Sequence, residues 1–231
     1  MTLMTWWHTD RLPILPALPG FSAQALRDDG LIAELNRLDH GEIRARRRDG
    51  HTPFVARLDG IPAAYGWSAS RRAAIGELGL RISLVRDERY LWDFATLPAF
   101  RGRGIYPHLL QSIIRAEQVA RIWILHAPEN LPSGTGMIRA GFLPVGRLSF
   151  QADGRVALAD ISDDLRAWWA AETFGIPLAE HVAPCWHCAT SNTPCGCRHH
   201  TASAGSHCCC AIPVGLKLSL PHAARHAAYA I

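Results

Sequence analysis

One stretch of the chain, residues 92–110, limits the possible folds more than any other. It begins with a short apolar segment typical of a buried strand, passes through a turn with two glycines and two arginines, and ends in the first turn of an amphipathic helix. Such a turn gathers backbone N–H groups beside the positive end of the helix dipole. Arg101 and Arg103 add formal charge, so we expect this turn to bind a phosphate rather than only to face water.

The composition indicates a globular protein with a hydrophobic core. The chain has 231 residues, of which 48% are hydrophobic and 19% charged. No apolar run reaches the roughly 18–20 residues that cross a bilayer, and residues 1–20 lack the layout of a signal peptide, so we expect a cytoplasmic protein. The net charge of +4 comes almost wholly from arginine, and the basic runs at 44–48 and 71–72 lack interleaved aromatic residues. Nucleic-acid binding is therefore the weaker alternative.

The order of the predicted elements is that of an α/β protein. Residues 1–20 are expected to be an irregular lead-in, and 21–38 to be helical, with Ser22 as the N-cap and Gly30 dividing the segment. Two apolar runs joined by Asp59-Gly60 predict a β-hairpin. The remaining predicted elements are a third strand (75–85), a central strand (90–97), a helix (107–120), a strand parallel to the central one (121–126), a short helix (133–140), a hairpin (142–150 and 155–161) and a last helix (162–175).

Two motifs on these elements match one known family. Arg101-Gly-Arg-Gly104 follows Thr96-Leu97-Pro98, and Asn130 precedes Arg139-Ala-Gly-Phe142 at the usual spacing before the last hairpin. The chain thereby resembles the GNAT superfamily of acyl-CoA N-acyltransferases over residues 21–160. The resemblance implies an α/β fold with a mixed, mostly antiparallel sheet flanked by helices. A C-terminal helix at 161–180 and a tail at 181–231 would follow the GNAT domain.

The resemblance also implies a coenzyme A site. The backbone of Phe94, Ala95 and Thr96 would pair with the pantetheine arm as an added strand would. The turn and the helix that follows it would hold the pyrophosphate, and Asn130 would reach the cofactor from the other side, unless its side chain only shapes a local turn. The residues of the turn that would take part are Arg101, Gly102, Arg103, Gly104, Ile105 and Tyr106.

The chain departs from the family pattern at two places. Tyr106-Pro107 stands where the family ends its turn with glycine or alanine, and proline removes one N–H donor. Met137 occupies the position where many members have a tyrosine that acts as general acid, and a thioether cannot give a proton to a leaving thiolate. Tyr106, Ser133 or water would then supply the proton, or the thiolate would leave unassisted.

The implied reaction is direct attack of an amine on the thioester, which needs a base because the amine is protonated at neutral pH. Asp93 on the central strand and Glu77 on a neighbouring strand are the first candidates, and Glu129 and His126 stand behind them. The alternative for Asp93 is a carboxylate paired with a nearby arginine. A main-chain N–H near Thr96 would polarise the carbonyl. The aromatic residues that either line an acceptor pocket or pack in the core are Tyr65, Trp67 and Trp92.

The tail differs in chemistry from the rest of the chain. All seven cysteines follow position 184, and two close pairs, Cys185 with Cys188 and Cys195 with Cys197, could surround a zinc ion. The second pair is separated by one residue only, which weakens the match. A disordered tail with incidental thiols is the equal alternative, and disulfides are the least favoured in a cytoplasmic protein.

Taken together, these features predict an enzyme that uses acetyl-CoA to acetylate an amine of a small molecule or peptide. The alternative from another class is a non-catalytic acyl-CoA sensor or adaptor whose tail recruits a partner, which Met137 favours. The sequence leaves the acceptor and a homodimeric assembly open, because acceptor pockets in this fold share no motif.

Overall fold

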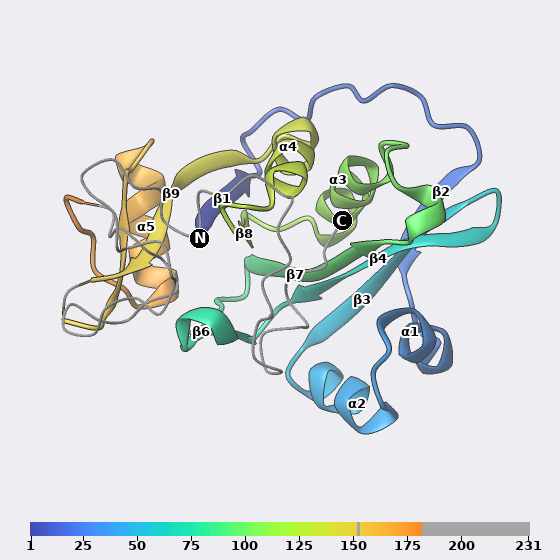
Figure 1. Cartoon of the computed structure of the whole chain (residues 1–231), viewed down its shortest axis with the longest axis horizontal. Coiled ribbons are helices and arrows are strands. Elements are labelled where there is room, and N and C mark those ends of the chain that lie inside the picture. Colours follow the sequence, from blue (N-terminus) through green and yellow to red (C-terminus); the bar gives the residue numbers. More distant parts are fainter. Residues whose placement is uncertain (152, 182–231) are drawn as a thin grey trace, which may run out of the picture.

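The computed structural model describes residues 1–151 and 153–181 (Figure 1). Its centre is an eight-stranded sheet of order β10-β9-β1-β8-β7-β4-β3-β2, in which only β7 and β8 run parallel. The strands are β1 (Thr2–Trp7), β2 (Phe21–Ala25), β3 (His51–Leu58), β4 (Ile61–Ala69), β7 (Glu88–Thr96), β8 (Arg121–His126), β9 (Leu143–Phe150) and β10 (Val156–Ala159). The helices are α1 (Asp29–Asn36), α2 (His40–Arg48), α3 (Ile105–Glu117), α4 (Leu131–Ala140) and α5 (Asp164–Phe174). This is the predicted α/β fold with a mixed, mostly antiparallel sheet.

Helices cover both faces of the sheet. In Figure 1, α3 and α4 lie above it, and α1 and α2 lie below. Leu109 and Leu110 of α3 belong to the same buried cluster as Leu91 and Phe94 of β7. On the opposite face, α1 and α2 contribute to a cluster around Trp67, while α5 packs on a third cluster with β1, β8 and β9. No helix among the described residues is long and apolar enough to span a membrane.

The expectation of an irregular N-terminus is wrong for residues 2–7, which form β1 between β8 and β9. Four of its six residues are apolar, and residues 3–6 are buried, so both faces of the strand are covered, as a central strand requires. The prolines that argued against a helix here all come later, in the segment that crosses α3, where Gln111 donates to the carbonyl of Pro13 at 2.8 Å. The strand therefore ends before the helix-breaking residues begin.

The predicted helix over 21–38 is also wrong in its first part. Residues 21–25 form the edge strand β2, which pairs with β3. Helix α1 begins later, because the Asp28 carboxylate accepts hydrogen bonds from the N–H groups of Gly30 and Leu31. A second helix that the sequence did not predict, α2, follows, and Asp39 caps it by accepting from the N–H of Glu42. Helix α2 buries only Ile43 among its apolar residues and therefore shows no apolar period.

The predicted third strand over 75–85 is a separate two-stranded hairpin. β5 (Arg72–Ile75) and β6 (Leu80–Ser83) pair with each other and not with the main sheet, and a 3-10 turn at Gly76–Leu78 joins them. Gly79 has a φ of +62°, which a continuous strand does not allow. The alternating apolar residues therefore reflect two short strands rather than one.

The other helices and strands predicted for residues 21–175 are present in the structure. The hairpin β3–β4 turns at Asp59-Gly60, β7 and β8 are joined through α3, and α4 ends at Gly141 with a left-handed φ of +105°. β9 and β10 form the last hairpin, and Asp163 caps α5. All the cysteines of the predicted zinc site lie outside the described residues. Within 1–151 and 153–181, no group of three or more His, Cys, Asp or Glu residues could hold a metal ion.

Candidate functional site

The two parallel strands at the centre of the sheet separate along their length. β7 and β8 pair from Glu88 to Leu91 and from Arg121 to Ile124. Beyond this point β7 continues to Thr96, still paired with β4 on its other side through Tyr65 and Ala64. In the described part of the chain no strand pairs with the other edge of residues 92–96. This edge therefore presents backbone groups to the space between β7 and β8.

A bulge causes the separation. Trp67 and Tyr65 of β4 pair with Trp92 and Ala95 of β7, so two β7 residues face the single residue Gly66. An extra residue in one strand bends it and increases its twist. Asp93, the first residue of the bulge, has a φ of +53°, and a Cβ atom on Gly66 would lie 2.1 Å from the Phe94 ring. The glycine thus makes room for the bulged strand.

The glycine-rich turn follows the free edge directly. After a 3-10 turn at Pro98–Phe100, Gly102 and Gly104 adopt φ values of +75° and +76°, and α3 begins at Ile105. No heavy atom lies within 4 Å of the position of a Cβ on either glycine, so the space in front of the turn is open. Arg101 and Arg103 are exposed. The arrangement offers backbone donors, a helix N-terminus and two cations to one anion.

Pro107 removes one donor from this helix N-terminus, as its sequence implies, and the preceding tyrosine is buried. The Tyr106 ring packs edge-on against Phe94, with ring centroids 5.5 Å apart, and fills the space next to Gly136 of α4. Its hydroxyl lies 3.5 Å from Ser133 Oγ. Burial raises the pKa of Tyr106, so its hydroxyl keeps its proton at neutral pH. Met137 is a core residue, 1% exposed, in the same cluster as Tyr106.

Asp93 is held by an arginine that the sequence did not single out. Arg46 of α2 donates from Nη1 to Asp93 Oδ2 at 2.5 Å and from Nη2 to Glu42 at 3.0 Å. Its guanidinium also lies over the rings of Trp67 and Trp92, at 4.9 and 4.4 Å from the ring centroids. These are the contacts of a carboxylate paired with an arginine, the alternative named for Asp93. Arg46 is one of four arginines within residues 44–48, on a helix that the sequence did not predict.

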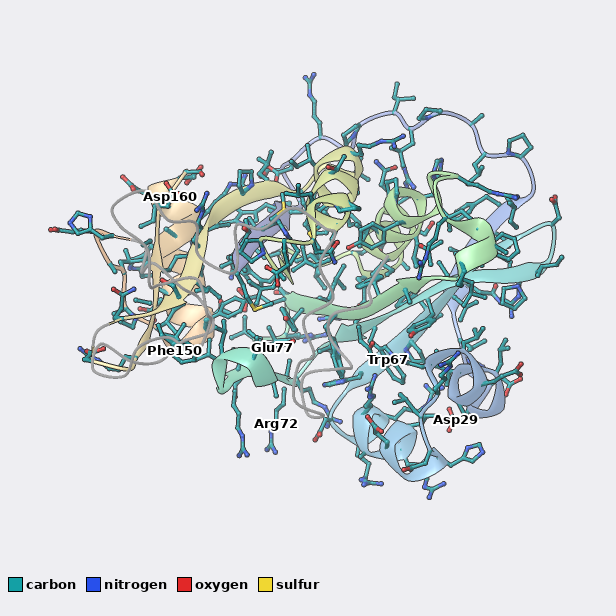
Figure 2. The ribbon with its side chains drawn as sticks, in the orientation of Figure 1. Asp29, Trp67, Arg72, Glu77, Phe150 and Asp160 are labelled. Atoms are coloured by element: carbon teal, nitrogen blue, oxygen red, sulfur yellow. The ribbon has the colours of Figure 1, made fainter. Side chains whose placement is uncertain are left out.

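Glu77 does not lie on a strand next to β7, and this expectation is wrong. It belongs to the 3-10 turn of the β5–β6 hairpin, where Figure 2 labels it, and the strands beside β7 are β4 and β8. Its negative charge adds to the effect of burial in raising the pKa of the Tyr90 hydroxyl. Glu77 therefore belongs to the two-stranded hairpin, whereas Asp93 belongs to the main sheet.

Asn130 and His126 border the other side of the separated strands. Asn130 caps α4, its Oδ1 accepting from the N–H of Ser133 at 3.2 Å. His126 ends β8, and its Nδ1 lies 2.8 Å from the carbonyl of Ala127, so Nδ1 carries the proton and Nε2 is the acceptor. Burial lowers the pKa of His126, which keeps the ring neutral at pH 7. Close by in sequence, Glu129 Oε2 is buried and has no hydrogen-bond partner among the described residues.

Solved structures of distant similarity are acetyltransferases. A GCN5-related N-acetyltransferase from Kribbella flavida is 15% identical with a TM-score of 0.42, over 62% of this chain and 53% of its own. The structure of yncA from Salmonella typhimurium with acetyl-CoA is 16% identical, with a TM-score of 0.43, and the match covers 56% of this chain and 83% of yncA. The ribosomal-protein-S18-alanine N-acetyltransferase from Escherichia coli is 16% identical, with a TM-score of 0.44, and the match covers 59% of this chain and 88% of that protein. The chain thus spans about half the length of the first of these proteins.

No curated protein matches the sequence significantly. The model of the acetyltransferase (GNAT) family, in contrast, matches residues 19–142, which is more than half of the chain. The matched region runs from β2 to the end of α4 and contains the bulge, the free edge of β7 and the glycine-rich turn. The chain therefore belongs to the acetyltransferase (GNAT) family.

Proposed function

We propose that this protein is an N-acetyltransferase that takes the acetyl group from acetyl-CoA and transfers it to an amine by direct attack. One observation carries the proposal: the unpaired edge of β7 leads straight into an open glycine turn at a helix N-terminus. An extended ligand could place its amide groups along the strand edge and its pyrophosphate at the turn that follows. Pantetheine followed by the pyrophosphate of coenzyme A is such a ligand.

In this proposal the backbone of Phe94, Ala95 and Thr96 binds the pantetheine arm. The N–H groups of the turn from Gly102 to Tyr106 and the charges of Arg101 and Arg103 bind the pyrophosphate. Asn130 orders the first turn of α4 on the opposite side of the arm through its bond to Ser133. Bound acetyl-CoA supplies the thioester carbonyl, and a backbone N–H at the bulge donates to its oxygen.

Tyr106 is the proposed general acid. Its hydroxyl, like that of any tyrosine, carries its proton at pH 7, and Ser133 Oγ lies at 3.5 Å on the side of α4. A protonated hydroxyl beside a leaving thiolate can supply the proton that Met137 cannot. Tyr106, from α3, thus takes over the task that a tyrosine on α4 would have.

For the general base, the contacts support His126 over Asp93 and Glu77. The Nε2 atom of His126 is unprotonated in the neutral ring, whereas the Asp93 carboxylate is already paired with Arg46 and Glu77 lies on the separate hairpin. A neutral imidazole can take a proton from the ammonium group or from the attacking amine. Asp93 is then a structural residue of the bulge, and it stays the direct competitor in the test of this assignment.

The test is release of free thiol from acetyl-CoA with a panel of amines, amino acids and peptides, together with calorimetric binding of coenzyme A. We expect binding and turnover with at least one amine class. Binding without turnover on any amine would instead favour the acyl-CoA sensor. Absence of binding would contradict both proposals.

The proposed anion site is tested by Gly104→Ala, with Gly60→Ala as the matched control. Both glycines have a positive φ (+76° and +80°) and open space around the Cβ position, but Gly60 lies in the β3–β4 turn. Each substitution should cost roughly 1 kcal/mol of stability. Only Gly104→Ala should weaken coenzyme A binding, by about tenfold or more, because its methyl group occupies the space in front of the turn. Equal affinities of the two variants would contradict the site.

A further inference from the structure

Three arginines surround a cavity that lies away from the glycine turn. The cavity has a volume of about 180 Å³ and is lined by Arg48, Asp49, Arg71 and Arg72. Arg48 ends α2, Arg72 begins β5, and Arg71 directly precedes it. All three arginines are exposed, and none has a carboxylate within ion-pair distance in the part of the chain that the structure describes. The cavity therefore carries a net formal charge of two that its own residues leave unbalanced.

The neighbouring arginines on α2 form ion pairs with carboxylates, in contrast to the three arginines of the cavity. Arg46 binds Asp93 and Glu42, and Arg47 binds Asp29. The positive charge of the helix is thus balanced over its middle and left free at its C-terminal end. Arg71 is also held in place, because its guanidinium donates to the carbonyl of Arg48. This bond links α2 to β5 and fixes the two sides of the cavity relative to each other.

Contacts connect the cavity to the bulge of β7. His51 donates from Nε2 to the carbonyl of Arg72 at 2.6 Å, and its ring meets the edge of Trp92 with centroids 5.2 Å apart. Trp92 directly precedes Asp93 in the bulge. Figure 2 shows Arg72 on the side of the sheet that carries α2, away from α3 and its glycine turn. The cavity therefore lies on the face opposite the proposed pyrophosphate site.

We infer that this cavity binds the phosphate group of the acceptor, so that the acceptor is a phosphorylated amine. The inference rests on the proposed acetyl transfer at the neighbouring bulge. Guanidinium groups form paired hydrogen bonds with phosphate oxygens. A phosphate monoester carries about −1.5 to −2 charges at pH 7, which balances the cavity, whereas a carboxylate balances half of it. Because the cavity is small and carries no aromatic side chain for base stacking, a single phosphate group fits it better than a nucleic-acid strand.

The first experiment measures binding without turnover. Inorganic phosphate is titrated into the full-length protein by calorimetry with coenzyme A present in saturating amount, so that the glycine turn is occupied. Arg48→Gln and Arg72→Gln should each weaken phosphate binding by about tenfold or more, since each removes hydrogen bonds to a charged group. The control is Arg81→Gln, at an exposed, unpaired arginine of β6 that does not line the cavity, and it should bind as the wild type does. The inference would be overturned if the wild type bound no phosphate, or if all three variants bound phosphate with the same affinity.

The second experiment compares acetylation of ethanolamine, O-phosphoethanolamine and β-alanine. We expect kcat/KM for O-phosphoethanolamine to exceed the other two by about tenfold or more. This preference should fall with added salt and disappear in Arg48→Gln and Arg72→Gln, with KM for acetyl-CoA unchanged. Equal rates for all three amines would overturn the inference and leave acetyl transfer standing. No acetylation of any amine would overturn the proposed function and the acceptor assignment with it. Tight binding of single-stranded DNA that competes with phosphate would point to a polyanion partner and overturn the inference as well.

Discussion

At the scale of single residues, the glycines mark where the chain makes room for another group. Gly66 accommodates the Phe94 ring, and Gly136 accommodates Tyr106. Both contacts lie on the α3 and α4 side of the bulge, where the proposed pantetheine arm would run. A methyl group at either position must displace an aromatic ring that helps to shape the proposed cofactor site.

Gly66→Ala should therefore destabilise the protein. The added Cβ would lie 2.1–2.6 Å from three atoms of the Phe94 ring, and overpacking of this kind costs about 1–3 kcal/mol. Urea unfolding should show a lower midpoint, and the second substitution Phe94→Leu should restore part of the loss. The control is Gly76→Ala, where no heavy atom lies within 4 Å and φ is not positive. A Gly66→Ala variant as stable as this control would contradict the packing argument.

Tyr106→Phe tests the proposed acid. The variant keeps the ring between Phe94 and Gly136 and removes only the hydroxyl near Ser133. We expect kcat to fall by about 100-fold, the lower range for loss of a general acid, with little change in KM for acetyl-CoA. Tyr90→Phe removes another buried hydroxyl and should leave kcat within about twofold. If both variants keep wild-type kcat, the thiolate leaves without help from Tyr106.

At the scale of elements, the site arises from one irregularity, the bulge that separates β7 from β8. Asp93 adopts its left-handed φ while its side chain binds Arg46 of α2, so the helix holds the bulge in place. A left-handed φ is tolerated best by glycine, asparagine and aspartate. Asparagine at this position can keep both the conformation and a hydrogen bond to the arginine. The bulge therefore needs a residue that tolerates a left-handed φ and bonds to Arg46, and it does not need a carboxylate that takes up a proton.

The base assignment is tested by the pH dependence of kcat/KM in His126→Gln and Asp93→Asn. Because burial lowers the pKa of His126, activity should fall only as the pH drops below 6.5, where the ring becomes protonated. His126→Gln should remove this acid limb and lower the plateau by about 100-fold. Asp93→Asn should keep the limb and most of the activity. The titration of the amine is common to all three proteins and cancels in the comparison. An inactive Asp93→Asn beside an active His126→Gln would make Asp93 the base.

The elements that the sequence predicted well are those whose signal is local. β3, β4, β7 and β8 are apolar runs ended by turn residues, and α4 ends at a glycine. β1 and β2 were missed because short apolar or mixed segments become strands only by pairing with distant partners, Ile122 and Arg57 among them. Helix α2 was missed because its arginines mask a single buried position. The glycine turn followed from its motif, but the Arg46–Asp93 pair joins two elements far apart in sequence.

At the scale of the whole molecule, one buried and one half-buried histidine lie on different parts of the sheet. His51 begins β3 beside the arginine cavity, and His126 ends β8, one of the two strands that separate at the proposed coenzyme A site. Burial lowers the pKa of both rings. His51 Nδ1 has no hydrogen-bond partner among the described residues, so protonation there would place a charge in a site that has nothing to receive it. The two rings couple the stability of the whole fold to pH.

The folded protein should therefore lose stability as the pH falls from 7 toward 5. Between the lowered pKa values and the ordinary value near 6.5, the unfolded chain binds more protons than the folded one, so protonation favours unfolding. Each histidine contributes at most about 1.4 kcal/mol per pH unit. Urea unfolding at several pH values should show this decline, and His51→Gln, whose amide can still donate to the Arg72 carbonyl, should reduce its slope by roughly half. An unchanged slope in His51→Gln would mean that this ring has the same pKa in the folded and the unfolded chain, so that its burial beside the arginine cavity does not oppose protonation.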